Sequence, residues 1–231
     1  MSALSSKVTA LLAASIVSSQ AVVVWTGNTS SDPFDDTNWD FSGSAVTAVD
    51  SNVSIADDIT ITGGNLEIPN LTGQVRLQIG NGFTMTLDNS ILGLVGGGND
   101  GVGGEPSGTG VDINLTNGSE LNVFFIVNGV SLDIDSTSSA TFGGGGNPVN
   151  ISSVNLTDGA VLQFLLEDPT EFTNEHLSKV TVDGAPAVDG VNISIEPFNG
   201  GGSRITVLGI PEPSSAMLMS LAGLGLLVRR R

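Results

Sequence analysis

Carboxylate side chains gather in two short stretches of the sequence. Carboxylates can bind calcium, or act as an acid–base pair on a glycosidic bond. The two stretches contain Asp32, Asp35, Asp36, Asp40, Glu167, Asp168, Glu171 and Glu175. We expect both stretches to be solvated loops and expect no cofactor, with calcium as the alternative.

Few other residues are available for catalysis. Between residues 22 and 211 the basic side chains are Arg76, Lys179 and Arg204, and none stands beside an aspartate cluster. The one histidine, His176, lies in a polar stretch (EFTNEHLSK), which favours a surface position. The sequence has no nucleophile elbow and no phosphate loop. We therefore predict no catalytic residues and no enzyme activity.

The balance of charge limits the partners. The 231-residue chain has 24 Asp and Glu side chains against 7 Lys and Arg. Nucleic acid is an unsuitable partner, because phosphate binding needs clustered cations. The chain has no cysteine, which excludes disulfides and thiolate zinc sites. Residues 96–101 (GGGNDG) are similar to one calcium-binding nonapeptide turn, but such sites need tandem copies.

The body of the chain, residues 22–209, alternates apolar and polar residues with a period of two, which is typical of β-strands. Gly-Gly and Asn-Gly pairs between the alternating segments indicate turns. The expected strands include residues 58–62, 75–79, 83–87 and 111–116. A helix is expected only over residues 169–179, with Thr173 or Asn174 as its cap. The sequence thus predicts an all-β domain.

A degenerate repeat runs through this body. NLTNGSELNV (residues 114–123) aligns with NLTDGAVLQF (residues 155–164), and one aliphatic marker can be assigned to each of four copies. The markers, 28, 19 and 22 residues apart, are Leu87, Leu115, Ile134 and Leu156. One coil of a parallel β-helix, a solenoid that buries alternate aliphatic residues, has this size. The alternative is an antiparallel β-sandwich in which the same units are hairpins.

The start of the body carries two tryptophans. Trp25 opens a W-x-G sequence, Trp39 closes an N-W pair, and residues 50–55 read DSNVSI. This pattern, over about 35 residues, resembles the first coil of autotransporter-like β-helical proteins exported by bacteria. The resemblance implies that both tryptophans cover the open end of the β-helix, where the first coil has no neighbour.

Residues 1–21 have the features of a secretory signal helix. Lys7 precedes a short apolar run at residues 8–17, and Ser19 and Ala21 place small side chains where a signal peptidase reads them. We expect cleavage after Ala21, and export of the chain.

Residues 210–231 combine three features in order. They are the motif of Pro211, Glu212 and Pro213, the apolar or small residues 216–228, and the basic cluster of Arg229, Arg230 and Arg231. As a helix the apolar run spans roughly 20 Å, against roughly 30 Å for the hydrocarbon core, so we expect a short transmembrane helix. The arginines favour the cytoplasmic side, which places the body outside the inner membrane.

This order of motif, apolar run and arginines resembles the PEP-CTERM sorting signal of Gram-negative, biofilm-forming bacteria. The resemblance covers about 21 residues and carries no direct information on the body. It implies that an exosortase, a membrane transpeptidase-like enzyme, cuts at or near the motif of Pro211, Glu212 and Pro213, and that the inner membrane holds the protein only transiently. An ordinary C-terminal membrane anchor is the alternative.

These features together predict an exported, acidic protein of the cell surface or extracellular matrix, with a structural or adhesive role. Extracellular polysaccharide is its expected partner beside the exosortase. One alternative is a carbohydrate-binding module, which needs an exposed aromatic platform although aromatic residues make up only 5% of the chain. The other is a β-helical enzyme acting on polysaccharide, which needs a groove with converging acids.

Overall fold

A computed structural model of the chain describes residues 22–30, 32, 35–42, 44, 54–55, 58–62, 65–69, 76–95, 101–104 and 110–209. The expected signal, with Ala21, and the expected sorting segment, from Pro211 to Arg231, lie outside the described residues. Residues 96–100 of the glycine-rich stretch also lie outside them. Within the described ranges, no helix combines the length and the apolar character needed to cross a membrane.

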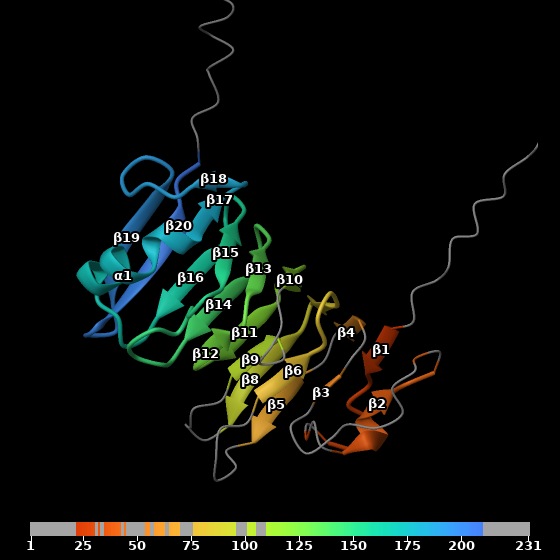
Figure 1. Cartoon of the computed structure of the whole chain (residues 1–231). Coiled ribbons are helices and arrows are strands. Elements are labelled where there is room, and N and C mark those ends of the chain that lie inside the picture. Colours follow the sequence, from red (N-terminus) through yellow and green to blue (C-terminus); the bar gives the residue numbers. More distant parts are fainter. Residues whose placement is uncertain are drawn as a thin grey trace, which may run out of the picture.

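The described residues form mainly β-strands, in three sheets (Figure 1). In spatial order, the nine-stranded sheet contains β18 (Ala185–Pro186), β17 (Val180–Val182), β15 (Ser153–Leu156), β13 (Val130–Ile134), β10 (Val111–Thr116), β7 (Thr84–Asp88), β4 (Asp58–Thr62), β1 (Val22–Trp25) and β2 (Trp39–Asp40). The seven-stranded sheet contains β19 (Ile193–Phe198), β20 (Gly202–Val207), β16 (Val161–Phe164), β14 (Ser139–Phe142), β11 (Glu120–Val123), β8 (Ile91–Val95) and β5 (Asn65–Pro69). The four-stranded sheet contains β12 (Phe125–Val127), β9 (Gly101–Gly104), β6 (Arg76–Ile79) and β3 (Ser54–Ile55). The four strands expected from alternation are confirmed to within one residue at each end.

The chain visits the three sheets in turn. From β4 to β12 it passes three times through the nine-stranded, seven-stranded and four-stranded sheets, in that order. Each strand of one passage pairs in parallel with its counterpart in the passage before: β7 with β4, β8 with β5 and β9 with β6. Sequence-distant strands are therefore neighbours throughout the middle of the molecule.

The markers of the sequence repeat lie side by side in this pairing. Leu87 is the register partner of Leu115, Leu115 of Ile134, and Ile134 of Leu156. The same row continues to Ile61 at one end and to Val182 at the other. The predicted repeat is thus confirmed as a spatial one, with one aliphatic residue contributed by each strand of the row.

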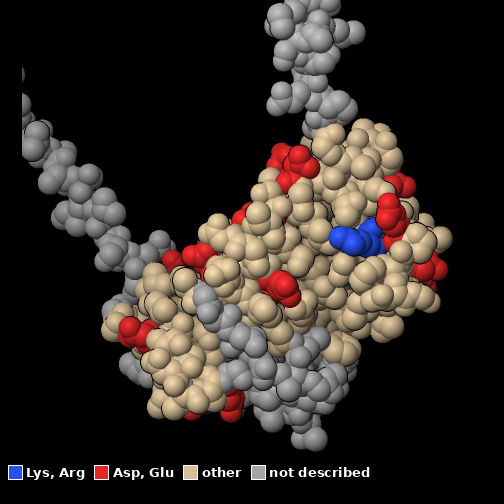
Figure 2. Space-filling view, turned by 180° about the vertical axis from the view of Figure 1, so that it is seen from behind, with Lys and Arg blue, Asp and Glu red and all other residues tan. Residues whose placement is uncertain are grey.

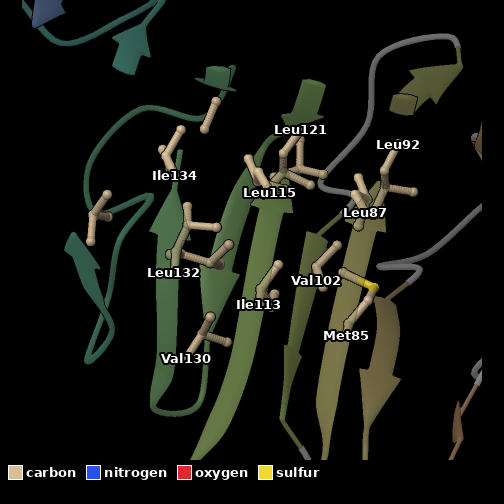
Figure 3. Close-up of a cluster of buried hydrophobic side chains, with 14 of the residues drawn as sticks. Met85, Leu87, Leu92, Val102, Ile113, Leu115, Leu121, Val130, Leu132 and Ile134 are labelled. Carbon is tan, nitrogen blue, oxygen red and sulfur yellow. The ribbon is translucent and has the colours of Figure 1, made fainter. Parts of the chain in front are cut away.

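The core fills the space between the sheets. The row of marker residues is at most 4% exposed, and a parallel row through Met85, Ile113 and Leu132 is fully buried. Figure 3 shows these side chains gathered with Leu92, Val102 and Leu121 from the other two sheets. Burial of one such side chain contributes about 1.5–3 kcal/mol to the free energy of folding, so the stacked rows are its main favourable contribution.

Turns between the nine-stranded and seven-stranded sheets are held by a row of buried serines. Ser90 N–H donates to Ser119 Oγ at 3.1 Å, and Ser119 N–H donates to Ser138 Oγ at 3.0 Å. The preceding pair, Asn117 and Gly118, adopts φ of 58° and 82°, a left-handed backbone that favours asparagine and glycine. The aligned copy keeps the glycine, since Gly159 follows Asp158 there and adopts φ of 98°.

Antiparallel strands close the two ends of the molecule (Figure 1). At one end β2 pairs with β1, and the paired Trp25 and Trp39 are buried with ring centroids 4.8 Å apart, edge to face. A Cβ at Gly27 would lie 3.3 Å from Trp25 Nε1, so the W-x-G spacing places a glycine against the indole. At the other end β18, β19 and β20 form the antiparallel pairs, and a short helix packs on β19 and β20.

Candidate functional site

The helix at this second end, α1 (Pro169–Glu175), follows β16 and continues into a 3-10 turn, η2 (Leu177–Lys179). This confirms the helix expected over residues 169–179. The expected cap at Thr173 or Asn174 was wrong, because Asp168 caps the helix. Its carboxylate accepts from the N–H groups of Thr170 and Glu171 at 2.7 and 3.0 Å, and Glu171 Oε2 accepts from Asp168 N–H at 3.0 Å. The sequence D-P-x-E signals this capping box.

Aromatic rings join α1 to the end of the core. Phe164, on β16, has its ring centroid 5.3 Å from Phe142 and 5.2 Å from Phe172. His176, the C-cap of α1, stacks on Phe164 at 5.0 Å with 12° between the ring planes. Phe172 and His176 are four residues apart and therefore share one face of the helix. That face covers the last strand of the parallel part of the seven-stranded sheet.

His176 is fully buried, and the prediction of a surface histidine was wrong. Neither ring nitrogen has a hydrogen-bond partner. Burial lowers the pKa of His176 from 6.5 to about 4, with a further contribution from the positive charge of Lys179. The imidazole is consequently neutral near pH 7, with a lone pair available on one nitrogen.

Glu167 is also buried, with 3% of its surface exposed, so the expectation of a solvated loop was wrong for this residue. It was also wrong for Glu171 and Glu175, which lie in α1. Glu167 Oε1 accepts a short hydrogen bond of 2.5 Å from the N–H of Gly146. Burial raises the pKa of Glu167, and the carboxylates of Glu171, Glu175 and Asp168 raise it further, while the Gly146 N–H opposes the rise. A negative charge at this carboxyl is therefore poorly compensated.

Glu167, Glu175 and His176 form one cluster. Their potential ligand atoms, one from each side chain, all lie within 4.8 Å of one another, and Glu175 is exposed. No other such group of three histidine or acidic side chains occurs among the residues that the structure describes. Lys179, beside the cluster, donates from Nζ to Asn147 Oδ1 at 2.7 Å, and burial lowers its pKa. We call Glu167, Glu175 and His176 the end cluster.

Glu167 and Glu175 were predicted as part of an acidic stretch, and their contact with His176 was not predicted. The spacing of Phe172 and His176 on one helical face is a signal that could have placed the histidine inside. No local signal marks Glu167 for burial, because its partner Gly146 is distant in sequence. Of the other basic candidates, Arg204 is exposed on β20.

The first acidic group serves local structure. Asp35 caps the 3-10 turn η1 (Asp36–Asn38), accepting from Thr37 N–H at 3.0 Å and from Thr37 Oγ1 at 2.6 Å. The two bonds from Thr37 hold the pKa of Asp35 below its usual value, and Ser42 N–H does the same for Asp40. Asp32, Asp36 and Asp40 are exposed, as predicted, but Asp36 lies in η1 and Asp40 in β2 and not in a loop.

Comparison of the chain with protein-family models, with curated proteins and with solved structures finds no match.

Proposed function

We propose that the body of the chain is a parallel β-helix that serves as a structural or adhesive unit outside a bacterial cell. The observation that carries the architecture is the parallel, in-register pairing of successive passages. A sandwich of hairpins would instead pair consecutive strands antiparallel. Among the described strands, antiparallel pairs occur only at the two ends, where they cover edges that would otherwise promote aggregation.

A polar row on the nine-stranded sheet supports the adhesive role. Register partners in successive strands are Thr86, Asn114, Asp133, Asn155 and Thr181. Asn155 Nδ2 donates to Asp133 Oδ1 at 2.9 Å, and Thr181 Oγ1 donates to Asn155 Oδ1 at 2.8 Å. Strand spacing repeats these amide, hydroxyl and carboxylate groups about every 4.8 Å. Such a regular row suits a polymer rich in hydroxyl groups, such as an extracellular polysaccharide.

The acidic surface supports a role outside the cell as a soluble or surface-attached unit. The chain has a formal net charge of −17, and Figure 2 shows acidic side chains in separate places over one face, with little basic surface. Copies with this charge repel one another at low salt, which limits uncontrolled association.

Export and sorting rest on the two terminal segments of the sequence. In this proposal the chain is cleaved after Ala21, held by residues 216–228 with Arg229, Arg230 and Arg231 on the cytoplasmic side, and cut by an exosortase-type peptidase at Pro211, Glu212 and Pro213. After sorting, the protein attaches to the extracellular matrix and acts there as a structural or adhesive component without catalysing a reaction.

The test uses cells that contain an exosortase. Glu212→Ala, or deletion of the three arginines, should leave the precursor in the inner membrane, as measured by fractionation and by mass spectrometry of both termini. Glu196→Ala, a control at an exposed glutamate on β19, should be exported normally. Extracellular molecules that mostly retain residues 216–231 would refute the sorting proposal.

A further inference from the structure

We infer that the end cluster of Glu167, Glu175 and His176 binds a divalent transition-metal cation, for which Zn²⁺ is the appropriate probe. This inference concerns a site in the body of the chain. It does not depend on how the protein is exported or on what it attaches to.

The buried histidine is the independent observation that points to a ligand. Buried polar groups almost always have a hydrogen-bond partner, and an exception calls for an explanation such as a bound ion. His176 is fully buried, and both of its ring nitrogens lack a partner. One of these nitrogens lies within 4.8 Å of carboxylate oxygens of Glu167 and Glu175. A cation between them would give the imidazole its missing partner.

The donor set selects the kind of cation. Calcium and magnesium take oxygen ligands, whereas an imidazole nitrogen suits zinc, copper, iron or nickel. Zinc bonds to nitrogen and carboxylate oxygen at about 2.0–2.2 Å, so two donors on one ion lie up to about 4 Å apart. The potential ligand atoms of the end cluster lie within 4.8 Å of one another, so small side-chain movements would bring them to that spacing. Exposure of Glu175 gives the ion a path from solvent.

Charge at the cluster also favours a cation. Glu167 is buried, and the neighbouring carboxylates of Glu171, Glu175 and Asp168 repel its negative charge. A bound cation would offset this repulsion. The nearby ammonium of Lys179 donates a hydrogen bond to Asn147 Oδ1 at 2.7 Å.

The position of the cluster indicates what the ion does. Glu167 precedes α1, whereas Glu175 and His176 end it, so one ion would connect both ends of the helix. The ring of His176 lies on Phe164, at the end of the core. Binding would therefore fasten α1 over the end of the buried interior, and its expected consequence is a more stable C-terminal end.

The experiment measures zinc binding by the purified full-length chain after treatment with a chelator. Calorimetry gives the affinity, and thermal unfolding gives the stabilisation. We expect Zn²⁺ at a hundredfold excess over Kd to raise Tm by about 5–10 °C. Because the chain has one histidine, the imidazole NMR signals report coordination by His176 directly.

Three variants remove one ligand each while keeping the shape of the side chain. His176→Phe preserves the stacking on Phe164, Glu167→Gln still accepts from Gly146, and Glu175→Gln changes an exposed residue that should not affect folding. Each should weaken zinc binding at least tenfold. Glu196→Gln, the same change at an exposed site on β19, should leave the affinity unchanged.

Any one of three results would overturn the inference. The first is unchanged zinc affinity in both Glu175→Gln and His176→Phe. The second is a stabilisation by Ca²⁺ that equals that by Zn²⁺ and survives in His176→Phe, since the imidazole would then have no role. Absence of any Zn²⁺ effect on Tm and on the His176 signals would overturn it as well.

Discussion

The middle of the molecule and its C-terminal end bury their interiors by different means. In the middle, from β7 to β16, aliphatic rows such as Leu87, Leu115 and Ile134 are continuous, and each passage covers the one before. At the end, the cover is a helix and antiparallel strands that do not follow the repeat. The buried polar side chains there, His176, Glu167 and Ser203, belong to no repeated row, unlike the buried serines of the middle.

The difference shows where chemistry enters a repetitive fold. A repeated strand needs only an aliphatic residue on its inner face, because its neighbours present the same surface. The last strand has no following neighbour, so an irregular segment must fit its particular shape. Ser203, whose Oγ also lacks a partner, stands opposite Phe164 in the pairing of β20 with β16. Among the described residues, the other buried side-chain atom without a partner outside His176 is Trp25 Nε1, at the opposite end, and the middle has none.

The largest effect is expected at the ring that joins the two regions. Phe164→Ala removes the centre of the stack of Phe142, Phe172 and His176 and should lower the free energy of unfolding by about 3–5 kcal/mol. Equilibrium denaturation in urea measures it. Leu166→Ala is the control, since that side chain is 59% exposed and should cost little. Equal costs for the two variants would mean that the end is not packed on the core.

The next largest effect is a pH dependence of the free energy of unfolding that arises from His176 at the C-terminal end. The pKa of His176 is about 4 in the folded chain and about 6.5 in the unfolded one, so below pH 6.5 the unfolded state takes up a proton that the folded state does not. Stability should fall as the pH falls from 6.5 to 4, by at most about 3 kcal/mol.

The control for this pH dependence is His176→Phe, measured by denaturation at pH 7, 5.5 and 4. Glu167 acts in the opposite direction, because its raised pKa makes the folded state lose stability as the pH rises through the unfolded value. The difference between wild type and variant isolates the histidine. A difference that does not change with pH would contradict its burial as a neutral ring.

A smaller effect is expected in the middle, in the row of buried serines. Ser119→Ala removes the acceptor of the Ser90 N–H and should destabilise the chain by about 1–3 kcal/mol. The row ends after Ser138, because the next passage has Ala160 at the equivalent position. The N–H of Ser138 therefore bonds to the carbonyl oxygen of Asp135 and not to a serine hydroxyl. Ser136→Ala, at an exposed position, is the control in thermal denaturation. Equal losses would show that the serine row contributes nothing.

The sequence predicted the middle far better than the end, for a physical reason. Alternation and Asn-Gly turns are local, and the markers from Leu87 to Leu156 report a pattern that repetition makes redundant. The spacing of Phe172 and His176 indicates a shared helical face, but the ring beneath that face, Phe164, lies on β16 and is not marked in the segment around the histidine. Glu167 was missed for the same reason, since Gly146 reaches it from another turn.

The smallest effect tests whether the helix or its charges hold the end cluster in place. Asp168→Ala removes the N-cap bonds to Thr170 and Glu171 and should cost about 1 kcal/mol in the free energy of unfolding. Asp168→Asn is the matched control, because asparagine caps a helix as well as aspartate does while removing the charge. Asp168→Asn should therefore be as stable as the wild type. Both variants should lower the pKa of Glu167, since the charge of Asp168 is one of those that raise that pKa. Urea denaturation of both variants at pH 7 measures the cap, and a loss of stability as large in the asparagine variant as in the alanine variant would assign the effect to charge.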